Sequence, residues 1–244
     1  MILGKKVIVV LPAYHASKTL ERTVAELSPG IADEIILVDD ASRDTTVAIA
    51  CRLGLRVFVH EQNRGYGANQ KTCYGEALER GGDIIVMLHP DYQYSPRLVG
   101  AMAHMAASGD YDVVLGSRIL AQNAVARGMP RHKYIANRLL TAIQNLMIGQ
   151  KLSEYHTGFR AFTRVVLESI PWQENSDNFL FDNQILCQVL RAGFRIGEIS
   201  CPTRYFPEAS SIGLWQSVIY GLGVLQCCLR YARWSSRKSR QSPA

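Results

Sequence analysis

The sequence predicts an α/β protein with a mostly parallel sheet flanked by helices. Short apolar, β-branched runs alternate with helix-like stretches in the first half of the chain, which is typical of right-handed β–α–β crossovers. Polar or glycine-rich residues follow these runs, at the sheet edge where open α/β sheets bind ligands. The length of 244 residues and hydrophobic fraction of 48% suffice for one large core.

Five strands are predicted first, each closed by a polar residue, a glycine or Pro12. They are Lys5–Leu11, Glu34–Val38, Arg56–His60, Asp83–Leu88 and Asp112–Leu115. The helices between them are Thr19–Leu27, Thr45–Leu53, Ala68–Arg80 and Pro96–Ala107.

The regular alternation of predicted strands and helices ends after about residue 120. Helices are predicted over Arg131–Met147 and Asp182–Arg191, and a strand over Arg195–Pro202. With no internal repeat and no low-complexity linker, we expect one unit over residues 1–210. A C-terminal apolar or amphipathic helix and a basic tail are expected over residues 211–244.

The charge pattern argues against a general nucleic-acid surface. There are 27 basic and 21 acidic residues, but the excess is concentrated after Arg230, so the rest of the chain is close to neutral. The six cysteines have no CxxC pairing and predict reduced thiols. The N-terminus leads directly into the first strand without a signal-peptide pattern, so a cytoplasmic protein is expected.

The uncharged stretch Ile212–Leu229 contains glycines and glutamines, so it is marginal as a membrane span. Because a basic tail follows, we favour a peripheral helix at the inner membrane face, on anionic lipid. The alternative is a core helix with a solvated tail.

Two adjacent carboxylates, Asp39 and Asp40, close the second predicted strand in "ILVDDASRDTT". One alternative is that Asp40 or Ser42 caps the next helix. The other is that the carboxylates bind a nucleobase, a ribose or a divalent cation.

In "NRGYGANQK", Gly65 and Gly67 precede a helix. They are either turn residues or positions where backbone N–H groups approach a phosphate.

The motif "HPDYQ" follows the fourth predicted strand. In an extended segment the side chains of His89, Asp91 and Gln93 would lie on one side. Oxygen ligands suit Mg²⁺, and Mn²⁺ also accepts imidazole, so the motif predicts a cation site. The alternative for His89 is a hydrogen-bonded structural role.

The ordered set "VVLPAYHASKTLERTV", "ILVDDASRDTT", "QNRGYGANQKTCYGEAL", "VMLHPDYQYSP", "LGSR" and "TGFRAF" resembles the family 2 glycosyltransferases. The similarity covers roughly residues 5–210 and is greatest to the dolichyl/polyprenyl-phosphate sugar synthase branch. It implies the GT-A fold, Rossmann-like, and a nucleotide-sugar donor.

The resemblance also implies roles for residues in the matching motifs. Nucleotide binding is expected from Pro12, Ala13, Tyr14, Asp39, Asp40, Gly67 and Lys71. Asp91 matches the second aspartate of the family's DxD metal motif, and His89 stands where the first is expected. We therefore expect His89, Asp91 and Gln93 to hold Mg²⁺ or Mn²⁺. A second departure is "YHAS", where relatives often have an Asn-Glu pair.

The acceptor determines which further groups the reaction needs. A polyprenyl phosphate is already an anion and needs cations to position it, for which Ser117, Arg118, Arg131 and Lys133 are the candidates. Arg131 and Lys133 are alternatively solvated charges on a helix.

A hydroxyl acceptor needs a general base, for which Asp182 is the candidate, or else Asp182 caps a helix. His156 is a weaker candidate for contacting the diphosphate or the acceptor. The predicted catalytic residues are Asp91, Asp182 and Arg118.

The sequence thus favours an inverting, metal-dependent transfer of sugar from a UDP- or GDP-linked donor to a polyprenyl phosphate. Transfer to a hydroxyl acceptor is the first alternative. A catalytically silent nucleotide-sugar-binding protein is the second, because His89 replaces an aspartate.

Overall fold

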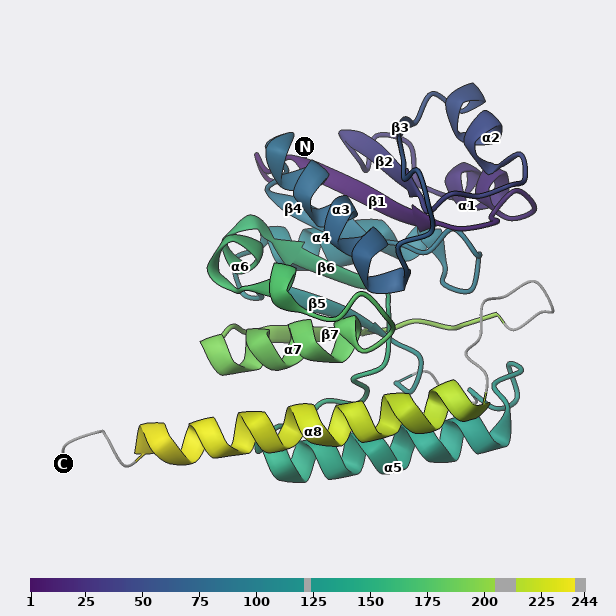
Figure 1. Ribbon diagram of the computed structural model, residues 1–244. Coiled ribbons are helices and arrows are strands. Elements are labelled where there is room, and N and C mark those ends of the chain that lie inside the picture. The colour runs from purple at the N-terminus through teal and green to yellow at the C-terminus, as the bar shows by residue number, and fades with distance from the viewer. Residues whose placement is uncertain (121–123, 205–213, 240–244) are drawn as a thin grey trace.

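The computed structural model describes residues 1–120, 124–204 and 214–239, without the side chains of 214–218 and 232–239. A seven-stranded sheet has the order β3-β2-β1-β4-β6-β5-β7 (Figure 1). The strands are β1 Val7–Ala13, β2 Glu34–Asp39, β3 Arg56–Val59, β4 Ile84–Met87, β5 Val113–Ser117, β6 Arg160–Thr163 and β7 Ile196–Ser200. The predicted α/β class and mostly parallel sheet are confirmed.

The helices follow the predicted ones closely, except that no helix was predicted at α6. They are α1 Leu20–Ala25, α2 Thr46–Arg52, α3 Tyr66–Glu79, α4 Val99–Ala107, α5 Arg131–Ile148, α6 Arg164–Ser169, α7 Phe181–Ala192 and α8 Leu214–Ser239. Two short 3₁₀ turns, Pro96–Leu98 and Trp172–Glu174, precede α4 and α7. Gly149 and Gly193 end α5 and α7 in the left-handed conformation, the usual way to terminate a helix.

Two features of the sheet differ from the prediction. Strand β6 lies within "EYHTGFRAFTR", for which no strand was predicted, and it pairs antiparallel with both β4 and β5. Strand β1 does not end at Pro12 but continues to Ala13, paired with β2 up to Asp39. Its pairing with β4 ends earlier, at Val10 opposite Met87, so a proline beyond that point removes no hydrogen bond to β4.

Buried residues cover both faces of the sheet. The alternate residues Val7, Val9 and Leu11 pack with α1, α2 and α4, whereas Ile8 and Val10 pack with α3, α6 and α7. This alternation follows from the period of two along a strand. It fixes the direction in which the strands, and the residues at their ends, point.

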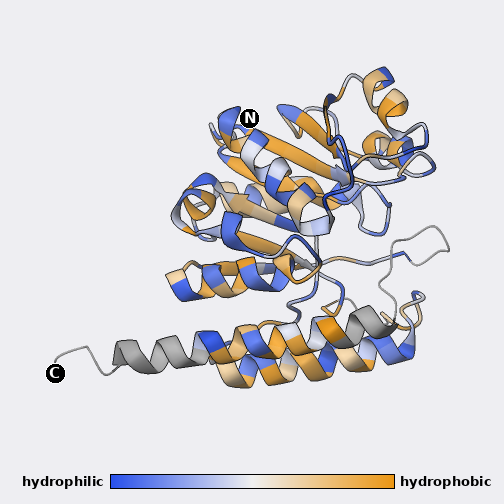
Figure 2. Ribbon diagram, in the orientation of Figure 1, coloured by the Kyte–Doolittle hydropathy of each residue, from blue (hydrophilic) through white to orange (hydrophobic). Residues whose placement is uncertain are grey.

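Helices α5 and α8 lie side by side as a separate layer at one end of the sheet (Figure 1). Val224, Cys227 and Cys228 of α8 join the buried core, while Figure 2 shows apolar and hydrophilic residues interspersed along α5 and along the coloured part of α8. No helix in the described ranges is long and apolar enough to span a membrane. The division at residues 210 and 211 lies outside the described residues, as does Arg240 of the tail.

Candidate functional site

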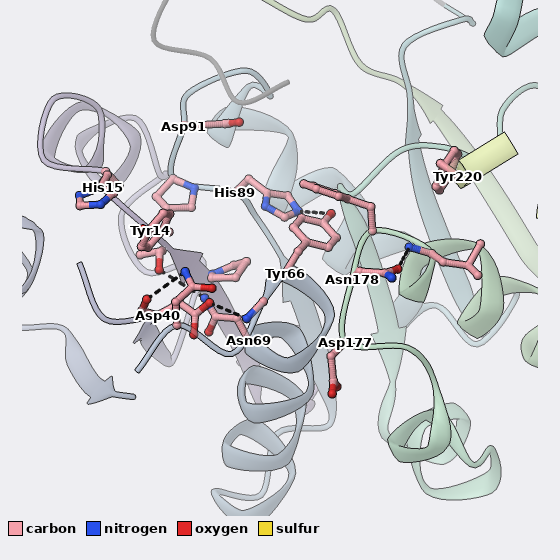
Figure 3. A pocket seen from close by; sticks show the side chains of 18 of the residues that line it. Tyr14, His15, Asp40, Tyr66, Asn69, His89, Asp91, Asp177, Asn178 and Tyr220 are labelled. Carbon is pink, nitrogen blue, oxygen red and sulfur yellow. Dashed lines mark hydrogen bonds between the residues drawn. The ribbon is translucent and has the colours of Figure 1, made fainter. Parts of the chain in front are cut away.

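A cavity of about 740 Å³ opens at the carboxyl ends of β1, β2 and β4. Figure 3 shows Tyr14, Asp40 and Asn69 on one side of it, His89 and Tyr66 in the middle, and Asn178 and Tyr220 on the other side. Chain segments far apart in sequence therefore meet here. The predicted position of the site at this sheet edge agrees with the cavity.

The polar wall of the cavity consists of Pro12, Tyr14, Asp40, Asn63 and Asn69. Ala13 lines it as well, so four of the seven predicted nucleotide-binding residues reach the cavity. Tyr14 is 54% exposed, and its ring is available for a flat ligand to contact. Asn69 is fixed by donating to the carbonyls of Val38 (3.1 Å) and Ala13 (3.3 Å).

Asp40 organises the loop that precedes α3. Its carboxylate accepts the N–H groups of Arg64 (2.8 Å) and Gly65 (2.9 Å) and lies 2.7 Å from His60 Nδ1. These bonds keep a buried charge paired, as burial requires. Asp40 is therefore a loop anchor at the cavity as well as part of its wall.

Asp39 is fully buried and makes a different set of contacts. Its Oδ2 accepts the Ser42 N–H at 2.8 Å, whereas Oδ1 is buried without a hydrogen-bond partner among the described residues. A buried carboxylate oxygen left unpaired is costly. Asp39 is not among the residues that line the cavity, so its nucleotide-binding role stays a prediction.

Gly67 and Lys71 do not line the cavity but tie α3 to the segment 175–178. The Gly67 N–H donates to the Asp177 carbonyl at 2.8 Å, and a Cβ at position 67 would lie 2.3 Å from the Ser176 carbonyl oxygen. The Lys71 ammonium donates to Asp177 Oδ1 at 2.7 Å and to the Asn175 carbonyl. Packing thus explains this glycine, and a nucleotide-binding role for either residue stays a prediction.

His89 and Asp91 line the cavity, whereas Gln93 does not and is buried. The expected extended segment is wrong, because β4 ends at Met87 and Tyr92 has a left-handed backbone with φ of 61°. Asp91 Oδ1 accepts the Gln93 N–H at 3.1 Å, a local turn that bends the chain. Two of the three predicted cation ligands therefore face the same space.

Tyr92 holds this turn in place. Its ring is sandwiched between the guanidinium groups of Arg22 and Arg204, 4.1 and 4.2 Å from the ring centre, and its hydroxyl donates to Glu26. Such cation–π contacts add to the burial of the ring. The neighbouring Asp91 is consequently carried by an anchored turn.

Asp182 is buried at the start of α7 and is not among the described residues that line the cavity. Its Oδ2 accepts the Tyr66 hydroxyl at 2.6 Å and its Oδ1 accepts Gln70 Nε2 at 3.1 Å. The buried Arg160 guanidinium lies 3.8 Å from Oδ1. Both oxygens accept hydrogen bonds from the protein, and a role of Asp182 as the base for a hydroxyl acceptor stays a prediction.

The predicted acceptor residues are not brought together at the cavity. Ser117 bonds to Ser153 at 2.7 Å, and the Arg118 guanidinium pairs with the fully buried Glu154 and donates to the His156 carbonyl. Burial raises the pKa of Glu154, but the Arg118 charge together with the hydrogen bonds from Arg118 and Asn137 lowers it by more, so the net pKa lies below the usual value. Arg131 and Lys133 lie in the first turn of α5.

His156 is enclosed next to the cavity. Its Nδ1 lies 2.8 Å from the hydroxyl of Tyr220, which lines the cavity. Burial lowers the pKa of His156 to about 4. The ring is therefore neutral at physiological pH, and its predicted contact with diphosphate or acceptor remains a prediction.

An apolar wall of Phe179, Leu180, Ile219 and Tyr220 closes the cavity opposite the polar wall. Ile219 is 53% exposed. None of these residues was among the predicted site residues, and neither were Tyr66, Asn69 or Asn178. The apolar-wall residues and Asn178 come from the loop before α7 and from α8, outside the quoted motifs, whereas Tyr66 and Asn69 lie in α3 within the motif "QNRGYGANQKTCYGEAL".

The residues after β4 fit a divalent cation that is coordinated partly by the protein and partly by oxygens of a diphosphate. Among the described residues no three His, Cys, Asp or Glu side chains form a closed metal cluster. His89 and Asp91 together supply only two donors. Mg²⁺ in proteins is commonly held by one or two carboxylates plus phosphate oxygens, and imidazole extends the fit to Mn²⁺.

A model of the family described as "Glycosyl transferase family 2" matches residues 8–170. The chain belongs to this family. The glycosyltransferase resembles AglD of Haloferax volcanii, with 30% identity over 85% of the chain, although it spans only 34% of that relative. It is 27% identical to a UDP-N-acetylglucosamine--dolichyl-phosphate N-acetylglucosaminyltransferase of Methanococcus voltae, covering 82% of this chain and 86% of the relative.

The fold has solved counterparts. The structure of glucosyl-3-phosphoglycerate synthase from Mycobacterium tuberculosis with UDP matches with a TM-score of 0.72 and 21% identity, covering 94% of this glycosyltransferase and 80% of that chain. The same synthase has been solved with Mn²⁺, UDP and phosphoglyceric acid. At this identity the likeness establishes the GT-A-like architecture. The predicted family and fold are both confirmed.

Proposed function

We propose that this glycosyltransferase moves a sugar, with inversion, from a nucleotide-sugar to a polyprenyl phosphate. A phosphate oxygen of the acceptor attacks the anomeric carbon, and the bond from that carbon to the diphosphate oxygen breaks. The leaving nucleoside diphosphate takes the electron pair. Since the acceptor is already an anion, no proton has to be removed from it.

One observation carries this proposal: a polar wall and an apolar wall face each other across one cavity, with His89 and Asp91 lining it. The polar wall suits a nucleoside diphosphate, because Tyr14 offers a ring and Asp40 and Asn69 hold the chain around it. The apolar wall suits the first isoprene units of a lipid. A water-soluble acceptor such as a free saccharide would gain little from that wall.

The donor is most simply uridine-linked. Both the Methanococcus voltae relative and the solved synthase are named with a uridine nucleotide. The buried, unpartnered Oδ1 of Asp39 is an acceptor suited to the imide N–H of uracil. Guanine also presents an N–H donor, so a GDP-sugar is the alternative donor.

A divalent cation, Mg²⁺ or Mn²⁺, would be held by His89, Asp91 and oxygens of the diphosphate. When bound, it neutralises the charge that grows on the leaving diphosphate. The residues of this chain contribute its placement: the turn at Tyr92 fixes Asp91, and Tyr66 contacts His89. Solved structures of the synthase with Mn²⁺ or with Mg²⁺ are consistent with this assignment.

The surface of α5 and α8 supports an acceptor that resides in a membrane. Both helices have Lys and Arg residues but no Asp or Glu. Ile135, Leu139 and Leu146 form an exposed stripe on α5, and Leu146 is 86% exposed. On α8, Ile219, Leu222 and Leu229 are half or more exposed, so the apolar wall continues into this face. A cationic, apolar surface of this kind suits peripheral contact with anionic lipid.

A product assay tests the proposal. Purified protein with Mn²⁺ is given UDP- and GDP-sugars, with and without polyprenyl phosphate, and the organic extract is analysed by mass spectrometry. A new glycosyl phospholipid confirms the reaction. Release of nucleoside diphosphate without a lipid product, in the presence of a hydroxyl compound that becomes glycosylated, would refute the lipid-phosphate acceptor. If no product forms with any donor, the remaining alternative is a catalytically silent nucleotide-sugar-binding protein.

Asp182→Asn separates the two acceptor classes. If Asp182 were the base for a hydroxyl acceptor, its loss would lower kcat on the order of 10²–10⁴-fold. With a phosphate acceptor we expect less than about a tenfold loss, because Asp182 has only its contacts to Tyr66, Gln70 and Arg160 to lose. Asp110→Asn, at an exposed carboxylate before β5, controls for a general change of charge.

A further inference from the structure

His89 is connected to Asp182 through the hydroxyl of Tyr66. The Tyr66 oxygen lies 3.2 Å from His89 Nε2 and 2.6 Å from Asp182 Oδ2. The Tyr66 and His89 rings are parallel, with their centres 5.4 Å apart. Tyr66 is thus in direct contact with both an expected cation ligand and a buried carboxylate.

The direction of each hydrogen bond in the series Asp182–Tyr66–His89 follows from what each group can donate. Asp182 pairs with the buried Arg160 guanidinium at 3.8 Å, and a carboxylate only accepts hydrogen bonds. The Tyr66 hydroxyl has one hydrogen to donate, and its contact with Asp182 Oδ2, at 2.6 Å, is shorter than its contact with His89 Nε2, at 3.2 Å. Tyr66 therefore donates its hydrogen to Asp182. Its oxygen can only accept from His89, so Nε2 must carry a hydrogen.

Packing closes the same edge of the imidazole. A Cβ at position 158 would lie 2.5 Å from His89 Nε2, so the backbone at Gly158 approaches this nitrogen closely. Nε2 is enclosed by Gly158 and Tyr66, which leaves no room for a ligand there. The other nitrogen, Nδ1, has no hydrogen-bond partner among the described residues, and His89 lines the cavity.

We propose that Tyr66 is a positioning residue that holds His89 as the Nε2–H tautomer and so presents the Nδ1 lone pair to the cation. This inference rests on the proposed function in assigning the cation to His89. It goes beyond that function by saying which nitrogen binds and why. The carboxylate, hydroxyl and imidazole act together as the outer hydrogen-bonded support that metal-bound histidines usually have.

The consequence is that the motif can still coordinate a cation although His89 replaces its first aspartate. An aspartate presents two equivalent oxygens, whereas an imidazole presents a lone pair on only one nitrogen of a given neutral tautomer. Without Tyr66 that nitrogen would be protonated in part of the molecules. By fixing the tautomer, Tyr66 keeps all molecules competent to bind the cation, so the apparent affinity is not reduced.

The first test is the tautomer itself, measured by ¹⁵N–¹H correlation NMR on the histidines of the full chain without metal. The spectrum is recorded at about pH 8, above the ordinary histidine pKa of roughly 6.5. We expect His89, assigned by comparison with His89→Gln, to show hydrogen on Nε2 alone, and Tyr66→Phe to show a mixture. Hydrogen on Nδ1 in the wild type would overturn the proposal.

The second test is Mn²⁺ binding in the presence of UDP, followed by electron paramagnetic resonance. Tyr66→Phe should weaken Mn²⁺ on the order of 10–100-fold, and the nitrogen coupling to the ion should be present in the wild type and absent in His89→Asp. In the His89→Asp background, Tyr66→Phe should change Mn²⁺ affinity little, because no tautomer remains to be fixed. An equal loss in both backgrounds would mean that Tyr66 is merely structural.

Tyr155→Phe is the matched control, since Tyr155 is fully buried and donates its hydroxyl to Asn145 at 2.9 Å. It should lose stability without a change in Mn²⁺ affinity. The two tests also separate this inference from the proposed function. If the protein transfers no sugar but its His89 tautomer and Mn²⁺ coupling are as expected, only the proposed function fails. If it makes glycosyl phospholipid with hydrogen on Nδ1, only the inference fails.

Discussion

The polar wall and the apolar wall face one cavity, but the chain assembles them in different ways. The polar wall comes from residues that directly follow β1 and β2, with α3 behind them. The apolar wall joins the loop before α7 to α8, more than thirty residues further along the chain. A site at strand ends is fixed by local sequence, whereas a site between packed elements depends on tertiary contacts. Substitutions in the two regions should therefore differ in whether they lower the stability of the protein or its catalytic rate.

The largest effect is expected behind the apolar wall, where Arg118 pairs with Glu154 and donates to the carbonyl of His156, the hydrogen-bond partner of Tyr220. Arg118→Ala leaves the fully buried Glu154 charge without its guanidinium, which should lower the free energy of unfolding by about 3–5 kcal/mol. Chemical denaturation measures this loss. Arg131→Ala, at an exposed residue, should stay within about 0.5 kcal/mol. If the Arg118→Ala variant is stable and has lost only acceptor binding, the result would instead support the predicted role of Arg118 in binding the acceptor.

The pH dependence of stability provides an independent check on the same pair. The pKa of Glu154 is lower in the folded protein than its ordinary value, so ionised Glu154 stabilises the fold above the ordinary glutamate pKa of roughly 4.3. That contribution is lost as the pH falls through the folded-state pKa. The stability difference between wild type and Glu154→Gln should therefore shrink on acidification. A constant difference would argue against the lowered pKa.

At the polar side the largest loss should be catalytic. Asp91→Ala removes a carboxylate that lines the cavity and should lower kcat on the order of 10²–10³-fold, with little change in thermal stability. Asp110→Ala, at an exposed carboxylate before β5, is the control. Undiminished turnover of Asp91→Ala would show that the cation is held elsewhere.

Gly67 joins the two regions and gives an intermediate effect. Gly67→Ala would place a Cβ 2.3 Å from the Ser176 carbonyl oxygen and should cost about 1–3 kcal/mol, since backbone must shift. Gly75→Ala lies in the same helix with open space around it and should stabilise by roughly 0.5–1 kcal/mol. Equal effects of the two substitutions in thermal unfolding would mean that the segment 176–178 moves away freely.

The smallest effect in solution is expected on α5. Leu139→Ser with Leu146→Ser should change the free energy of unfolding by less than about 0.5 kcal/mol, because both side chains are exposed. Binding to anionic vesicles, measured by co-sedimentation, should nevertheless fall several-fold. Val165→Ser, an exposed apolar residue on α6, should bind vesicles like the wild type. Unchanged binding of the double variant would remove α5 from the membrane contact.

The sequence predicted the part of the fold that local pattern determines. Buried runs and glycine or proline boundaries placed six of the seven strands, and the family motifs brought Tyr14, Asp40, His89 and Asp91 to one cavity. Strand β6 was missed because "RAFT" is short and has only two apolar residues; its partners β4 and β5 are what make it a strand. Tyr66 was missed for a similar reason, since its importance lies in contacts to His89 and Asp182, which are distant in sequence.

The close approach of Gly158 to His89 limits which residues position 158 can hold. An imidazole at position 89 fits only beside a residue without a side chain, because a Cβ at 158 would collide with Nε2. A shorter aspartate at position 89 would not fill that space. Position 158 must therefore stay without a side chain as long as the His89 imidazole keeps its contact with the Tyr66 hydroxyl.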